Sequence, residues 1–367
     1  MTTPDDVGIL DAPAAAKPST GRLTRIAALG FCLCALLFSF LGLFEWDVPV
    51  TRFVRSLNDV HIDHLSNPWL AKLSDGGDRI GRGESLVGLS LVVLAVGYAL
   101  KEATWKAAGW QSLLAHGMAA AISNLLKHLV GRPRPKFMHA GNVELSPAGG
   151  TGWDSFPSGH SSASFAMAAV FAARFPKVRW LIVSVATAVA ASRVLRGSHY
   201  LTDAVGGAVV GYLVGTVASS PWRAWRQALE SALLAVVTPV TALLVLFSTL
   251  GASVVADGWL GSMVPVGGAL VLAGAIGRLL SLVKSDIMPP WWSSQVAHIL
   301  VGGGFGLMTG SALTIGAVGC AGAAQWLYAG VGEETAVLRP GREVWLIACI
   351  SVGFVLAVEL RGIWPIR

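Results

Sequence analysis

Residues 26–44 read IAALGFCLCALLFSFLGLF and carry no charged side chain. A helix needs roughly 20 apolar residues to cross the hydrocarbon core of a bilayer. Phe44 and Trp46 stand at the end of the run, where aromatic side chains favour the membrane interface. The stretch therefore predicts a membrane-spanning helix over about 24–45. Because no small-residue cleavage pattern follows it, we expect a retained span and not a secretory signal.

The rest of the chain has the same apolar character. Of its 367 residues, 54% are hydrophobic and only 13% are charged, whereas soluble domains carry about 25% charged residues. This composition predicts an all-α, polytopic membrane protein. The long run 293–330 is expected to fold as two helices that turn near Thr309-Gly310-Ser311. Further spans are expected at about 84–100, 107–130, 158–175, 179–195, 199–219, 231–256, 262–283 and 343–360.

Residues 47–83 are mixed and partly amphipathic, which favours a segment that lies along the membrane surface. Turns are expected at Asn67-Pro68 and at Gly76-Gly77. The carboxylates that flank the second turn, Asp75 and Asp78, could bind a cation, but an ordinary turn is the preferred interpretation.

The formal net charge is +6, from 27 Lys and Arg against 21 Asp and Glu. The basic residues are scattered among predicted loops, with no basic helix or aromatic platform of the kind that binds nucleic acid. Loops on one side of the membrane are basic, which favours the cytoplasm for that side. The opposite face is basic too, through Arg52, Arg55, Lys72, Arg79 and Arg82, so the rule supports this orientation and does not decide it. The four cysteines lie in apolar runs without metal or redox spacing, and they are interpreted as small core residues.

Three short polar segments stand at the ends of apolar spans. Lys127 and Arg134-Pro135 follow the third span, Pro157-Ser158-Gly159-His160 opens the fourth, and Ser192-Arg193 with His199 and Asp203 joins the fifth to the sixth. If the spans alternate in direction, all three segments emerge on the same, non-cytoplasmic face. The helix count alone therefore predicts one shared site.

The residue types of this site suit phosphate chemistry. Lys127, Arg134 and Arg193 would surround a group with several anionic oxygens. Ser158 and Gly159 open a helix, whose free N–H groups favour an anion.

The two histidines of the site suit the transfer itself. Asp203 can orient His199 as a nucleophile, and His160 can protonate the leaving oxygen. A purely structural interpretation remains open for each feature. The cations could snorkel at helix ends, the histidines could be structural, His199 and Asp203 could form a surface pair, and Ser158 could simply start a helix. Arg132 and Lys136 flank the first segment and are expected to add positive potential at the entry.

The three segments resemble the signature of the type 2 phosphatidic acid phosphatase (PAP2) superfamily, in its membrane lipid phosphatase branch. That signature consists of Lys, six residues and Arg-Pro; Pro-Ser-Gly-His; and Ser-Arg, five residues, His, three residues and Asp. This sequence matches every fixed position. The resemblance implies a six-helix core and a phosphohistidine intermediate on His199, activated by Asp203. It also implies that His160 protonates the leaving group and that phosphate is held by Lys127, Arg134, Ser158, Gly159 and Arg193.

Three domains are expected: a disordered tail over 1–22, the PAP2-type core over 23–219, and an extension over 220–367 with four to five further transmembrane helices. The expected function is metal-independent hydrolysis of a phosphate monoester or diphosphate on a membrane lipid. No cofactor, metal or nucleic acid is expected. The expected location is the cell (inner) membrane, with the site facing the periplasm or exterior. A lipid phosphotransferase, or a lipid transport or binding protein that carries a PAP2-type domain, remains the alternative.

Overall fold

The computed structural model describes residues 20–56, 68–137, 145–150, 152–251, 259–283 and 294–329. Within these ranges the chain forms helices and no strand, as its composition predicts. The α-helices are α1 (Thr20–Phe44), α2 (Asp47–Ser56), α3 (Pro68–Gly81), α4 (Gly83–Ala99), α5 (Ala103–Val130), α6 (Gly159–Arg174), α7 (Arg179–Leu195), α8 (Leu201–Ala218), α9 (Trp225–Gly251), α10 (Trp259–Val283), α11 (Ser294–Thr309) and α12 (Ala312–Ala329). Short 3-10 turns lie at η1 (Pro135–Phe137), η2 (Pro176–Val178) and η3 (Trp222–Ala224).

The helices agree with the spans predicted from apolar runs, including the division of 293–330 into α11 and α12 at Gly310. Helix α1 begins at Thr20, inside the expected tail; the rest of that tail and the expected span 343–360 lie outside the described residues. By length and composition, five described stretches can cross a membrane: Arg22–Phe44, Ala103–Phe137, Pro176–Leu195, Leu201–Ala218 and Trp222–Ser248. Helices α3 and α4 give a sixth candidate, bent by 59°. The count of six core spans stays a prediction.

The turn predicted at Gly76-Gly77 is wrong, because both glycines lie inside α3. At Gly77 a Cβ atom would overlap the side chain of Ser192 on α7. The missing side chain thus permits close packing of α3 on α7, a tertiary demand that local turn propensity does not reveal. Asp75 and Asp78 face arginines and do not flank a turn.

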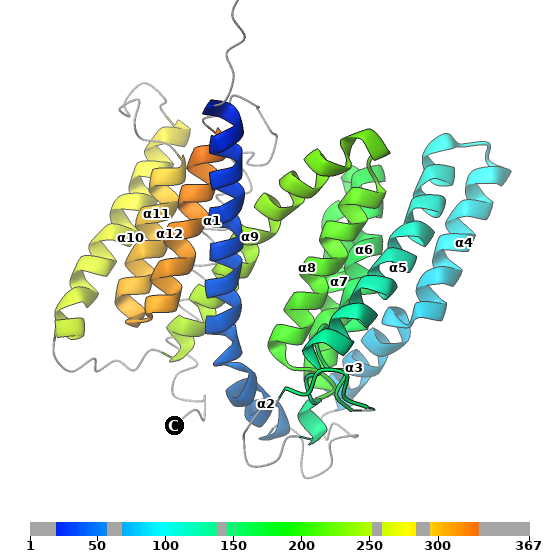
Figure 1. The fold of residues 1–367 in the computed structure, drawn as a ribbon, viewed down its shortest axis with the longest axis horizontal. Helices are drawn as coiled ribbons and strands as arrows, with labels where there is room; N and C mark the ends of the chain where they lie inside the picture. The colour runs from blue at the N-terminus through cyan, green and yellow to red at the C-terminus, as the bar shows by residue number, and fades with distance from the viewer. Residues whose placement is uncertain are drawn as a thin grey trace, which may run out of the picture.

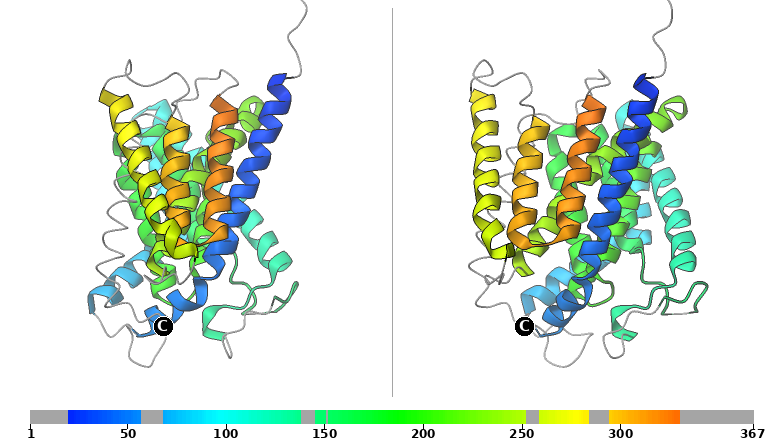
Figure 2. Two further views of the ribbon diagram at one scale, coloured as in Figure 1. Left: turned by 90° about the vertical axis from the view of Figure 1, so that its left-hand side faces the viewer. Right: turned by 60° about the vertical axis from the view of Figure 1, so that its left-hand side comes forward.

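Two groups of helices lie on either side of α9 (Figure 1). Helices α3 to α8 form one group, and α1 with α10 to α12 forms the other, while α9 crosses obliquely between them. Helix α1 packs along α12, as both views of Figure 2 show, and it also packs on α9. A second apolar core joins α4, α5, α6 and α8.

Close contact between α6 and α8 holds the two histidine segments together. Along α8, Gly207, Gly211 and Gly215 face backbone oxygens of Ser158, Ser162 and Ala166, and a Cβ atom at any of the three would overlap them. Small residues of this kind let helix backbones approach each other. The start of α6 therefore lies directly against the start of α8, where the chemistry-bearing residues are found.

Candidate active site

The three polar segments meet at one end of the α3–α8 group, at the foot of the view in Figure 1. Helix α5 ends there at Gly131, whose left-handed backbone (φ 55°) turns the chain away from the helix axis. The last turn of α7 and the segment before α8 are linked through the backbone, since the N–H of His199 donates to the carbonyl of Arg193 at 3.3 Å. The structure thus brings together the residues that the sequence analysis selected: Lys127, Arg134, Ser158, Gly159, His160, Arg193, His199 and Asp203.

His199 is buried and precedes α8 by two residues. Its Nδ1 lies 2.8 Å from the carbonyl oxygen of Ser155 and 3.7 Å from Oδ2 of Asp203. Because a carbonyl can only accept, Nδ1 carries the proton and Nε2 keeps its lone pair. Burial lowers the pKa of His199 below its ordinary value, against the opposing effect of Asp203. The imidazole is therefore neutral near pH 7, as a nucleophile requires.

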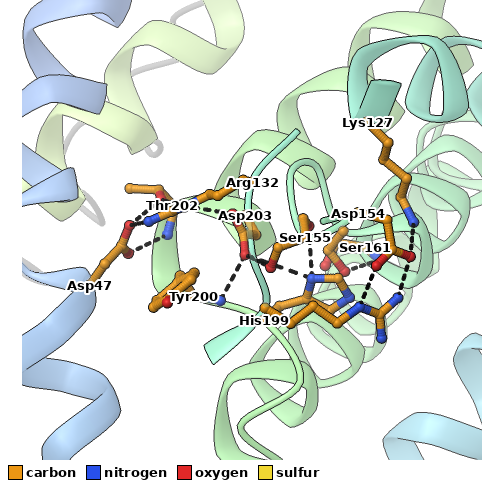
Figure 3. Close-up of polar contacts among 12 residues, drawn as sticks. Asp47, Lys127, Arg132, Asp154, Ser155, Ser161, His199, Tyr200, Thr202 and Asp203 are labelled. Atoms are coloured by element: carbon orange, nitrogen blue, oxygen red, sulfur yellow. Dashed lines mark hydrogen bonds and ion pairs between the residues drawn. The ribbon is translucent and has the colours of Figure 1, made fainter. Parts of the chain in front are cut away.

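Asp203 is fully buried and accepts several hydrogen bonds (Figure 3). Its Oδ2 accepts from Ser155 Oγ at 2.5 Å and from the backbone N–H of Tyr200 at 2.8 Å. Its Oδ1 accepts from Arg132 Nη1 at 2.7 Å. A carboxylate held in this way is stabilised in its charged form and cannot rotate away from His199.

Lys127 and Arg134 share one carboxylate, that of Asp154. Arg134 binds it through two hydrogen bonds, Nε to Oδ1 at 2.8 Å and Nη2 to Oδ2 at 2.6 Å, and Lys127 Nζ lies 3.8 Å from Oδ2. Burial would raise the pKa of Asp154, but the hydrogen bonds and charge of Arg134 outweigh it, so the pKa lies below its ordinary value. The Asp154 side chain is 40% exposed. A phosphate has the same forked geometry as this carboxylate and could take its place.

Arg193 and His160 face a second carboxylate, Asp78 of α3. Nη1 of Arg193 forms a short ion pair with Asp78 Oδ1, and His160 Nε2 lies 3.5 Å from the same oxygen. Arg82 and Arg196 reach the other oxygen, at 3.0 and 3.9 Å. Each cation selected as a phosphate ligand is thus paired with an acidic side chain, Asp154 or Asp78.

Ser158 and Gly159 form the start of α6. Ser158 is buried and caps the helix, since its Oγ accepts from Ser161 N at 3.4 Å. A Cβ atom on Gly159 would meet Lys127 Nζ at 4.0 Å and nothing closer. Gly159 therefore leaves open space between the helix N-terminus and the lysine, where backbone N–H groups favour an anion.

The sequence analysis named no role for Asp47, Asp154 or Ser155, and it gave Arg132 and Asp78 other roles than the structure does. Arg132 was expected at the entry, but it is 2% exposed and faces the buried side of Asp203. Asp47 gave no signal, because its partner Arg132 is 85 positions away. Asp78 was considered only beside the expected turn, since its partner Arg193 is 115 positions away. In the described part of the chain, no three His, Cys, Asp or Glu side chains gather as a metal-binding group.

Comparisons with known proteins agree with the signature. The family model described as the PAP2 superfamily matches residues 108–228. A lipid A 1-phosphatase of Rhizobium johnstonii is 38% identical over 92 residues, 24% of this chain and 38% of that protein; the match to a lipid A 1-phosphatase of Rhizobium etli is equally identical and covers 40% of it. The chain thus spans about two fifths of the length of these relatives.

Two proteins of Bacillus subtilis are also similar. Phosphatidylglycerophosphatase B is 29% identical over 161 residues, 41% of this chain and 74% of that protein. The crystal structure of a transmembrane PAP2-type phosphatidylglycerolphosphate phosphatase is 22% identical and covers 52% of this chain and 93% of its own, with a TM-score of 0.39. The family model, the relatives and the complete signature agree with one another: residues 108–228 of the chain match the PAP2 superfamily.

Proposed function

We propose that the protein hydrolyses a phosphate monoester or diphosphate on a membrane lipid through a phosphohistidine intermediate on His199. The observation that supports this most directly is the state of His199, a buried imidazole whose Nδ1 lies 2.8 Å from Ser155 O, which leaves the lone pair on Nε2. Arg134 and Arg193 lie near enough to act on its charge, and Lys127 shares Asp154 with Arg134. The relatives are named as phosphatases of lipid A and of phosphatidylglycerophosphate, which supports a lipid substrate.

The first step forms a bond between His199 Nε2 and phosphorus. Three cations and the N–H groups at the start of α6 hold the phosphate oxygens, where charge gathers in the transition state. The bond between phosphorus and the lipid oxygen breaks, and protonated His160 gives its proton to that oxygen. Burial and Arg193 disfavour a proton on His160, whereas Asp78 and a bound phosphate favour it, so the acid form is expected with substrate in place.

The second step reverses these roles. His160 takes a proton from water, the water oxygen attacks phosphorus, and the bond to Nε2 breaks. Inorganic phosphate leaves and His199 is neutral again. Neither step needs a metal ion, because the cations of the site balance the charge of the phosphate. Activity is therefore expected to survive EDTA. Activity that disappears with EDTA and returns with Mg²⁺ would contradict this mechanism.

The site is proposed to face the periplasm or exterior of the cell membrane. The opposite ends of the helices carry the basic loops that favour the cytoplasm: Lys101 and Lys106 after α4, Arg174, Lys177 and Arg179 between α6 and α7, and Arg223 and Arg226 after α8. A water-soluble, membrane-impermeant phosphate ester should therefore be hydrolysed by intact spheroplasts. Hydrolysis only after the membrane is opened would place the site inside.

The function is tested with purified protein in detergent and a panel of lipid phosphates: phosphatidic acid, phosphatidylglycerol phosphate, a polyprenyl diphosphate and lipid A. Wild type should release inorganic phosphate from at least one lipid and form an acid-labile phosphoenzyme. His199→Ala should do neither, whereas His128→Ala, an exposed histidine beside Lys127, should match wild type. Phosphate that passes to a second lipid or sugar and not to water would make the protein a phosphotransferase. Lipid binding without turnover would favour the transport alternative.

A further inference from the structure

A buried cluster lies behind His199, on the side away from the phosphate cations (Figure 3). Its members are Asp47, Arg132, Thr202 and Asp203, which we call the buried clamp; their exposed fractions are 2% or less. Arg132 donates from Nη1 to Asp203 and to Thr202 Oγ1, both at 2.7 Å, and from Nη2 to Asp47 Oδ2 at 2.6 Å. One guanidinium thus joins two carboxylates that are 156 positions apart in the sequence.

Asp47 contacts α8 directly as well. Its Oδ1 accepts from the backbone N–H of Thr202 at 2.9 Å, and its Oδ2 accepts a short hydrogen bond from the Thr202 hydroxyl. Asp47 therefore caps the first turn of α8 from a different helix, at the end where negative charge is stabilised. The rings of Tyr200 and Phe44 lie 4.1 and 4.7 Å from the guanidinium carbon of Arg132. Every polar partner of Arg132 is held in turn by a second contact.

We propose that Arg132 and Asp47 are positioning residues: they fix Asp203 behind His199 and balance its charge, so that His199 stays neutral and aimed until phosphate binds. This inference rests on the proposed function. The two residues touch no substrate and act through Asp203. Their position on the far side of His199 separates them from the cations that bind phosphate.

The charges of the clamp explain why an arginine stands there. With both carboxylates ionised and Arg132 positive, the clamp carries a net charge of −1. Attack on phosphorus makes the imidazole of His199 positive, and the clamp and His199 together are then neutral. Without Arg132, two uncompensated carboxylates would favour a proton on His199 before the substrate arrives, and a protonated imidazole cannot attack.

The clamp also connects the two groups of helices. Asp47 begins α2, which follows α1 after two residues, and α1 packs on α9 and α12. A second bond reaches the site from α2, since Arg55 Nη2 donates to the carbonyl of Pro135 at 2.7 Å. The first helix and the helices after residue 220 thereby hold Asp47 in place. This gives the C-terminal part of the chain a route to the catalytic centre.

The first measurement compares turnover with anion binding. At equal amounts of folded protein, Asp47→Asn should lower kcat about 10–100-fold, the usual effect of removing a partner that orients a catalytic group. The inhibition constant of inorganic phosphate should change by less than about threefold, because the phosphate cations are untouched. Arg132→Lys, which keeps the charge, should recover part of the activity lost in Arg132→Gln. Arg226→Gln, an exposed arginine on α9, serves as the control and should match wild type.

The second measurement is the titration of His199, followed by NMR of protein with ¹⁵N-labelled histidine and assigned with His199→Gln. The charged groups that act on His199 are Asp203, Arg193, Arg134 and, when protonated, His160. Arg132→Gln removes a positive charge behind Asp203 and should raise the pKa of His199 by about one unit. Asp47→Asn removes a negative charge and should lower it. If Arg132 and Asp47 only stabilised the fold, Arg132→Gln and Asp47→Asn would not shift the pKa of His199 in opposite directions.

Thr202→Val covers the case in which a charge variant does not fold. It keeps every charge of the clamp and removes the hydroxyl that accepts from Arg132 and donates to Asp47. The value of kcat should therefore fall at least about 3–10-fold, the effect of one such hydrogen bond. Unchanged kcat in Asp47→Asn and Thr202→Val, or shifts of the His199 titration in one direction for both charge variants, would overturn the proposal. If wild type releases phosphate from no lipid, the proposed function fails, whereas the titration still tests the clamp by itself.

Discussion

Arg132 and Arg134 are separated by one proline in the chain, yet they serve opposite ends of one site. Arg132 is 2% exposed and is saturated by Asp47, Thr202 and Asp203, whereas Arg134 is 26% exposed and pairs with the half-exposed Asp154. A fully buried ion pair is costly to break, because one charge is left without a partner. A pair open to water can exchange its carboxylate for another anion at little cost. Burial thus separates an arginine that positions from one that binds.

Loss of the general acid His160, which lies on the side of the phosphate cations, should have the largest effect on turnover. His160→Ala should lower turnover of a lipid or alkyl phosphate about 10²–10⁴-fold, the usual contribution of a general acid. An aryl phosphate has a good leaving group and should lose much less. Equal losses on alkyl and aryl substrates would mean that His160 mainly binds phosphate and that the acid lies elsewhere.

Alanine substitutions of Arg134 and Arg132 should differ in whether activity or stability is lost. Arg134→Ala should lower kcat/KM about 10²–10³-fold and weaken inhibition by phosphate and vanadate, with an unchanged melting temperature in detergent. Arg132→Ala should instead cost about 3–5 kcal/mol of stability, since Asp47 and Asp203 remain buried without their cation. The comparison fails if Arg134→Ala melts as early as Arg132→Ala.

The pH dependence of kcat/KM should report the protonation of the buried His199. A protonated His199 cannot attack, so activity falls as pH decreases through the pKa of His199. Because burial lowers that pKa from its ordinary value of 6.5, the acid limb of kcat/KM should lie below pH 6.5. A limb above pH 7 would indicate that Asp203, and not burial, dominates the environment of His199.

The sequence indicated where the phosphate cations, His160, His199 and Asp203 lie, but not the buried partners of Asp203. Lys127, Arg134, His160 and Arg193 lie at the ends of apolar runs, so their placement follows from the length and alternation of helices. The span boundaries follow from the same rule, as α6 over Gly159–Arg174 shows against the expected 158–175.

Residues that act through distant partners were not predictable in this way. Asp47 and Arg132 meet because α2 packs against the start of α8, a tertiary contact that no local pattern encodes. Gly76-Gly77 likewise resembled a turn, since the role of Gly77 depends on Ser192 of α7. Each of these errors arises where packing between distant helices overrides local preference.

The smallest expected effect has a diagnostic sign. Asp154 occupies the fork of Arg134 and lies near Lys127, and its lowered pKa keeps it charged across the neutral range. If it only fills the site until phosphate arrives, Asp154→Asn removes a competitor, and inorganic phosphate should inhibit about 3–10-fold more tightly, as for one displaced hydrogen-bonded charge. If it aims Arg134, the same change should weaken inhibition. Asp75→Asn is the matched control, because Asp75 pairs with Arg196 at 3.1 Å and is 60% exposed. Tighter inhibition in Asp154→Asn alone would show that the carboxylates at the open end are exchangeable, in contrast to those of the buried clamp.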